Sequence, residues 1–132
     1  MCTLSFIPHL NGYGVGMNRD ELRSRPRALA PRYFERYGVP AVYPSEPLGG
    51  TWIAANAYGQ LFAILNWYSA KACTFTEKQR SRGEIIPQMI FDSDFRAAAT
   101  ILGSPKLAGI LPFRLIGINP KHTVISEVKQ LF

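Results

Sequence analysis

Cysteine and histidine are scarce in this sequence, and neither is spaced for binding a metal. The two cysteines, Cys2 and Cys73, form no Cys-x-x-Cys pair, and His9 and His122 lie far apart along the chain. This pattern excludes the usual zinc and iron sites, so we expect no metal and no other cofactor. Two cysteines also do not make a disulfide framework, which favours a reducing compartment.

Long apolar runs are absent as well. No stretch approaches the ~18 consecutive apolar residues that a membrane helix requires. The N-terminus lacks the basic first region of a signal peptide, and Pro8 and His9 interrupt its short apolar stretch. We therefore expect a soluble, cytoplasmic protein without a membrane span.

Acidic residues are outnumbered by basic ones. The net charge is +6, from 15 Lys and Arg against 9 Asp and Glu, which bears on solubility and non-specific binding more than on a fold. Six arginines fall between Arg19 and Arg36, but Asp20, Glu21 and Glu35 dilute this run. The aromatic residues lie within apolar segments and do not alternate with the arginines, so nucleic acid is not the expected partner.

The remaining composition is that of one globular domain. The chain has 132 residues, of which 47% are hydrophobic and 18% are charged, and such a chain can bury roughly two thirds of its unfolded surface. Three hairpins are predicted from apolar or alternating segments that flank turn residues. They pair residues 2–7 with 13–18, residues 51–55 with 60–66, and residues 113–118 with 123–128. The first turn, Asn11-Gly12, is typical of type I′, in which both central residues have positive φ.

Two helices are predicted after the second hairpin. Ser81-x-x-Glu84 is a capping box, so a helix is expected from there to about Phe91, weakened by Pro87. A second helix, over residues 94–102, is expected to be capped by Ser93 or Asp92. Residues 67–80 are interpreted as a loop with a basic side.

Residues 22–50 contain five prolines, which predict extended or irregular structure with a short helical turn at 32–37. This segment is either a lid or pocket-lining loop or an ordinary surface excursion. The strands and helices do not alternate strictly, so the fold class is α+β with mostly antiparallel sheets.

Cys2 is the most informative candidate for chemistry. Removal of Met1 would leave a cysteine with both a thiol and a free α-amine, whose pKa values of about 8.5 and about 7.7–8.0 permit proton exchange near neutral pH. One residue then supplies the nucleophile and its general base. The alternative is that Cys2 merely begins the first strand.

Four blocks of sequence carry a family resemblance. They are Cys2-Thr3-Leu4 with Asn18-Arg19-Asp20-Glu21, then Gly49-Gly50-Thr51-Trp52-Ile53, Leu65-Asn66 and Ser81-Arg82-Gly83-Glu84. Together they resemble the NRDE family, which includes the transport and Golgi organisation proteins. The resemblance implies an N-terminal nucleophile (Ntn) hydrolase-like fold, a four-layer αββα sandwich, formed by residues 1–132 as one domain or its N-terminal part.

The resemblance also implies roles for individual residues. Arg19 would raise the thiolate fraction of Cys2, and Asp20 would hold the α-amine, as an Arg-Asp pair does in cysteine-type Ntn amidohydrolases. Asn66 would donate to the oxyanion. In the same pocket, Asn18, Trp52 and Trp67 are candidates for substrate binding. Arg19 and Asp20 could equally form a structural ion-pair cluster, Asn18 a turn, Asn66 a strand end and the tryptophans core.

Two functions remain open from the sequence. The first is hydrolysis of a non-peptide C–N amide by Cys2, with a small-molecule substrate. The second is non-catalytic binding or trafficking of a small ligand, haem or lipid, as the Golgi-organisation branch implies. Family members are longer than this chain, so it is a fragment, a reduced member, or a chain whose core a homo-oligomer completes.

Overall fold

The computed structural model describes residues 2–68, 79–103, 107–120 and 123–128. Eight strands form two antiparallel sheets. The strands are β1 (Thr3–His9), β2 (Gly12–Asn18), β3 (Leu29–Arg36), β4 (Val39–Ser45), β5 (Ile53–Asn56), β6 (Leu61–Asn66), β7 (Phe113–Ile118) and β8 (Thr123–Val128). The helices are short and are η1 (Arg82–Glu84), α1 (Ile86–Met89), α2 (Phe95–Ala99) and η2 (Thr100–Gly103).

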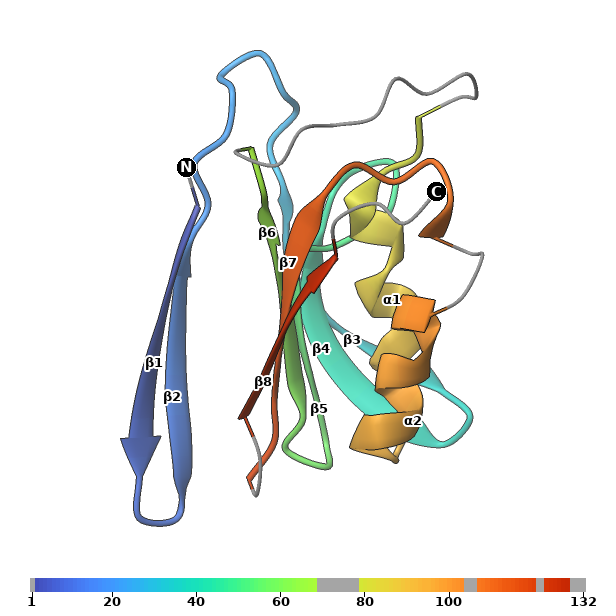
Figure 1. Ribbon diagram of the computed structural model, residues 1–132. Coiled ribbons are helices and arrows are strands. Elements are labelled where there is room, and N and C mark those ends of the chain that lie inside the picture. The colour runs from blue at the N-terminus through green and yellow to red at the C-terminus, as the bar shows by residue number, and fades with distance from the viewer. Residues whose placement is uncertain (1, 69–78, 104–106, 121–122, 129–132) are drawn as a thin grey trace.

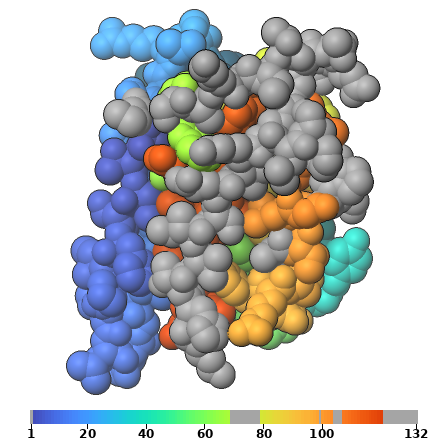
Figure 2. Space-filling model, viewed as in Figure 1, coloured from blue at the N-terminus to red at the C-terminus, as the bar shows by residue number. Residues whose placement is uncertain are grey.

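The two sheets lie face to face. Strands β1 and β2 form a two-stranded sheet, and β3 to β8 form a six-stranded sheet in sequence order, each strand antiparallel to the next. Figure 1 shows the hairpin β1–β2 on one face of the larger sheet and the helices on the other. The hairpin forms one flank of the molecule in Figure 2. The α+β prediction is confirmed, with three layers among the described residues.

Strand β6 lies at the centre of this arrangement and is covered on both faces. Successive side chains of a strand point to opposite faces, so Phe62 and Ile64 pack toward the helices whereas Leu61 and Ala63 pack toward the hairpin. All four are buried. This explains why β6 is apolar throughout instead of alternating.

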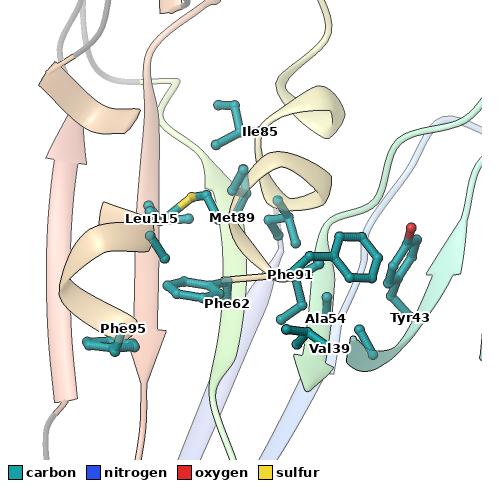
Figure 3. Close-up of a cluster of buried hydrophobic side chains, with 14 of the residues drawn as sticks. Val39, Tyr43, Ala54, Phe62, Ile85, Met89, Phe91, Phe95 and Leu115 are labelled. Atoms are coloured by element: carbon teal, nitrogen blue, oxygen red, sulfur yellow. The ribbon is translucent and has the colours of Figure 1, made fainter. Parts of the chain in front are cut away.

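The larger core lies between the six-stranded sheet and the helices. Ile85, Ile86, Met89 and Ile90 are fully buried there, and Figure 3 shows Met89 beside Leu115 of β7 in this layer. The smaller core lies under the hairpin. Its partly buried members are Leu4, Tyr13, Val15, Met17, Ile53 and Leu65.

The hairpins predicted at 51–66 and 113–128 are confirmed as β5–β6 and β7–β8. The first hairpin also forms, with Thr3 opposite Asn18 and His9 opposite Gly12. Its predicted turn is wrong, because the turn residues are Leu10 and Asn11. Neither has positive φ, so the turn is not type I′.

Residues 22–50 differ most from the prediction. They contain a fourth hairpin, β3–β4, in place of irregular structure, and the helical turn at 32–37 is wrong. Tyr37 and Gly38 make its two-residue turn with φ of 54° and 72°, the positive values that a tight hairpin requires. Pro31 is tolerated because β3 is an edge strand and its register shifts between Leu29 and Arg32, where Pro31 lies. Pro40 and Pro44 lie in β4, outside the two residues that pair with β5.

The first predicted helix is divided into η1 and α1. The Ser81 hydroxyl accepts a hydrogen bond from the Gly83 amide at 3.2 Å, but Glu84 binds Arg80 at 2.7 Å instead of closing a capping box. Pro87 lies in the first turn of α1, where a missing N–H costs no helical hydrogen bond.

The second predicted helix forms one residue later, over 95–103, and changes type along its length. It consists of α2 followed by η2, and its cap is Asp94 rather than Ser93 or Asp92. The Asp94 carboxylate accepts from the Arg96 amide at 2.9 Å. The loop predicted at 67–80 falls mostly outside the described residues, as do Lys71, Cys73 and Lys78. No helix in the described part of the chain is long and apolar enough to span a membrane.

Candidate functional site

A cavity of about 460 Å³ opens where the hairpin β1–β2 ends beside β6 and η1. All four sequence blocks contribute to its wall. Residues of those blocks that line it are Cys2, Arg19, Glu21, Thr51, Trp52, Asn66, Ser81, Arg82 and Gly83. Residues outside the blocks that line it are Leu22, Arg25, Glu46, Ile64, Tyr68, Gln79, Arg80 and Leu111. Segments as far apart in the sequence as Cys2 and Leu111 therefore meet at one place.

The register of the first hairpin positions Cys2. Because Thr3 pairs with Asn18, the residues that precede and follow the hairpin leave it side by side. The half-buried Cys2 thiol lies 3.9 Å from the backbone oxygen of Asp20, a weak hydrogen-bond contact. The hairpin thus brings Asp20 back beside Cys2, and Arg19 lines the same cavity as Cys2.

The carboxyl of Asp20 is exposed and interacts with the α-amino group of the chain. A hydrogen bond from this group lowers the pKa of Asp20, its positive charge lowers it further, and the small effect of burial opposes both. The amine that acts on Asp20 is the one carried by Met1, the residue that precedes Cys2.

Arg19 belongs to a network of two arginines and two glutamates. Its guanidinium contacts Glu21 at 2.8 Å and also Glu46, and Arg25 contacts the same two carboxylates at 3.0 and 3.3 Å. The Arg19 guanidinium also lies 4.1 Å from the centre of the Trp52 ring, within range of a cation–π interaction. These contacts fix the loop after β2 against β4 and β5.

The network also sets the ionisation of Glu21. Burial alone would raise the pKa of Glu21, but hydrogen bonds from the Leu22 amide and from Arg25, with the charges of Arg25 and Arg19, hold it below its usual value. Glu21 therefore stays anionic near neutral pH and keeps both arginines paired. Glu46 and Arg25 lie outside the sequence blocks, and their spacing gave no signal of this role.

Two glycines bring the second and fourth blocks together. The Thr51 amide donates to the Gly83 carbonyl at 3.0 Å, and a Cβ on Gly50 would lie 3.2 Å from the Gly83 carbonyl carbon. Gly50 also has a φ of 87°, in the region that side chains disfavour. Only glycine permits this crossing, which forms part of the cavity wall.

The remaining predicted site residues divide into two groups. Asn66 ends β6 at the cavity and donates to the Tyr68 hydroxyl at 2.7 Å, and Trp52 lines the cavity beneath Arg19. Trp67 is buried, does not line the cavity, and has the Arg114 guanidinium 5.1 Å from its ring centre. Asn18 is exposed at the end of β2 and is likewise absent from the cavity wall.

Arg82, from the fourth sequence block, also lines the cavity. Its Nε donates to the backbone oxygens of Leu111 and Pro112 at 3.2 and 3.1 Å. Burial lowers the pKa of the Arg82 guanidinium, Tyr68 opposes this effect, and the charge of Arg25 lowers the pKa further. The described residues contain no cluster of three or more His, Cys, Asp or Glu side chains that could hold a metal ion.

Comparison with known proteins adds one positive finding. The family model of transport and Golgi organisation 2 matches residues 1–130. No curated protein matches the chain.

Proposed function

Because the chain belongs to the transport and Golgi organisation 2 family, whose sequence blocks surround one cavity here, we propose that this cavity is an active site. Cys2, exposed as the N-terminal residue by removal of Met1, is the nucleophile of an Ntn-type amidohydrolase acting on a non-peptide C–N amide. The observation that carries the proposal is the convergence of Cys2, Asn66 and Arg82, from three separate blocks, on one cavity.

The reaction requires only the groups of Cys2 and water. The α-amine takes the thiol proton, the thiolate attacks the amide carbon, and a tetrahedral oxyanion forms. The C–N bond then breaks, the leaving amine takes the proton from the α-ammonium, and an acyl thioester remains. Water attacks the thioester with the α-amine as base, which releases a carboxylic acid and restores the thiol.

Three side chains support these steps. Asp20 lies beside Cys2, whose thiol is 3.9 Å from the Asp20 backbone oxygen, and after removal of Met1 its carboxylate accepts a hydrogen bond from the new α-amine and orients it. Asn66 lines the same cavity as Cys2, and the second N–H of its amide donates to the oxyanion. Arg19 acts through Glu21, Glu46 and Trp52, which makes it a positioning residue for the loop that carries Asp20.

The contacts of Arg19 also favour a second candidate function. In the described residues its guanidinium contacts Glu21, Glu46 and Trp52, and none of these contacts is with the thiol it was expected to activate. A cavity with an aromatic wall and arginines around it also suits a small hydrophobic or anionic ligand. The second candidate is therefore non-catalytic binding or trafficking of a small ligand, such as haem or a lipid, in the same cavity.

The deciding experiment measures the intact mass of the native protein before and after treatment with iodoacetamide. Under the hydrolase proposal, Met1 is absent and one site labels rapidly. Labelling disappears in Cys2→Ala and persists in Cys73→Ala, the matched control. Cys2→Ser retains a weaker nucleophile and serves as the conservative variant in later substrate screens.

Retained Met1, or a Cys2 that labels no faster than free cysteine, contradicts the hydrolase. In that event the binding function predicts that haem or a fatty acid raises the melting temperature of wild type and Cys2→Ala equally. A ligand bound to the folded state at 100 times its Kd stabilises by about 2.7 kcal/mol. No shift with either ligand contradicts the binding function.

A further inference from the structure

Positive charge exceeds negative charge around the cavity. Among the described residues, four guanidiniums line it against two carboxylates, and these groups are Arg19, Arg25, Arg80, Arg82, Glu21 and Glu46. Arg19 and Arg25 share the two carboxylates. Arg80 binds Glu84 at 2.7 Å. The excess charge therefore lies at Arg82.

Arg82 is held in place without being neutralised. Its Nε donates to two backbone oxygens, at Leu111 and Pro112, and these bonds restrict the plane of the guanidinium. Within the described residues no carboxylate lies within ion-pair distance of Arg82. The two terminal nitrogens remain available as a pair of donors, the arrangement that matches a carboxylate or phosphate in a bidentate contact.

The surroundings of Arg82 disfavour its charge. The side chain is half-buried, and burial together with the charge of Arg25 lowers its pKa. A second cation nearby and an unpaired, partly desolvated guanidinium are unfavourable until an anion arrives. A bound anion would relieve both effects, whereas a neutral ligand would relieve neither.

We propose that Arg82 binds an oxyanion, carboxylate or phosphate, carried by the substrate or ligand of this cavity. The inference deepens the proposed function, since it defines the substrate as an amide with an acidic group that reaches Arg82 while its carbonyl reaches Cys2. Trp52 offers an apolar wall in the same cavity.

The test compares thiol reagents that differ only in charge. The bromoacetyl derivative of aminohexanoic acid is measured against its methyl ester, and the corresponding alkyl phosphate is measured against its neutral diester. The rate of labelling at Cys2 is followed by intact mass in the Cys73→Ala background. Each acid-to-ester ratio is divided by the ratio for free N-acetylcysteine, which removes intrinsic differences between the reagents.

The proposal predicts a corrected ratio of about tenfold or more for one of the two acids, as expected of a charge-assisted hydrogen bond. Arg82→Gln brings the ratio to about one, and Arg82→Lys, which keeps the charge but not the paired donors, retains part of it. Arg96→Gln, an exposed arginine of α2 outside this cavity, leaves the ratio unchanged. The acid with the larger ratio identifies the group as carboxylate or phosphate.

A corrected ratio near one in the wild type, or one that Arg82→Gln does not change, overturns the proposal. If Arg82→Gln does not fold, inorganic phosphate is added to the wild type at constant ionic strength. It must then slow the acid reagent and leave the ester unaffected, and equal effects on both also overturn the proposal. The absolute rate of labelling by the ester reports the reactivity of Cys2 separately from the anion site. Slow labelling together with a high acid-to-ester ratio therefore contradicts the hydrolase proposal but supports the anion site at Arg82.

Discussion

The glycine crossing between the second and fourth sequence blocks permits a quantitative test. Three alanine variants separate the two costs of placing a side chain at this crossing, which are backbone strain and steric contact. Gly49 has a φ of 89° and open space at its Cβ position, so Gly49→Ala introduces only backbone strain. Gly83 has no such φ but would place a Cβ 3.3 Å from the Gly50 Cα, so Gly83→Ala introduces only a contact. Gly50→Ala introduces both.

The expected losses follow from these geometries. A side chain in the left-handed region costs about 1–2 kcal/mol, which is the prediction for Gly49→Ala. Overpacking costs about 1–3 kcal/mol, which is the prediction for Gly83→Ala. Gly50→Ala should lose the sum, about 2–5 kcal/mol, because the atoms that its Cβ meets at 3.2–3.3 Å are backbone and cannot rotate away.

Urea unfolding followed by tryptophan fluorescence measures these differences as shifts of the midpoint at constant slope. Equal losses for Gly49→Ala and Gly50→Ala would refute the close approach, since φ is nearly the same at both positions. A Gly83→Ala variant as stable as the wild type would also refute the close approach of Gly83 to Gly50.

Three further predictions concern other parts of the molecule. Asn56 is buried and bonds the Ile90 oxygen at 2.9 Å and the Tyr58 amide at 3.0 Å, so Asn56→Ala should cost more than about 2 kcal/mol by leaving these groups unpaired. Gln88 has an exposed side-chain amide, so Gln88→Ala should lower the free energy of unfolding by less in the same urea experiment. Equal losses for the two variants would contradict the role of Asn56. Tyr37 is 95% exposed with a φ of 54°, so Tyr37→Asn should stabilise by up to about 1 kcal/mol in calorimetry, and a lowered melting temperature would count against this. The α-amine of Met1 depresses the folded pKa of Asp20 below 3.8, so in the chain that keeps Met1 this interaction is present above that pH and is lost as the pH falls through the folded pKa. Acetylation of the α-amine should raise the pKa of Asp20 in a carboxyl NMR titration, and an unchanged value would exclude the interaction.

The sequence predicted the elements whose pattern is local. The hairpins β5–β6 and β7–β8 were predicted correctly because apolar runs flank polar turns. Hairpin β3–β4 was missed because its prolines were taken to exclude strands, whereas Pro31 is compatible with an edge strand that carries a register shift. The first helix was predicted too long because the Ser81-Glu84 pattern matched a capping box, whereas Arg80 provides the ion pair that Glu84 uses.

For the candidate site, the sequence identified Cys2, Arg19, Asp20, Trp52 and Asn66 without the contacts between them. Hairpin register alone was enough to bring Asp20 to Cys2. The partners of Arg19 depend on the path of residues 22–50, which local pattern did not give.

The position of Arg82 in the cavity wall was not predicted, for a similar reason. Its Nε donates to backbone oxygens about thirty residues later in the chain. Every residue has a backbone oxygen, so the residue types at those positions do not reveal this contact. Ion pairs and backbone contacts across long sequence separations therefore account for most of what sequence reasoning did not find.

The hairpin β1–β2 is a separate sheet from the one that contains β6. Residues of β6 and of η1 line the cavity opposite the hairpin's end. Side chains join the hairpin to the rest of the fold, through the small core under it and a hydrogen bond from the Tyr13 hydroxyl to the Gly59 oxygen at 2.6 Å. The gap between the sheets thus depends on the volumes of Leu4, Val15 and Met17, none of which lines the cavity. Substitutions at these three positions would move Cys2 relative to Asn66 and Arg82. Relatives with identical site residues would then bind substrates or ligands of different length.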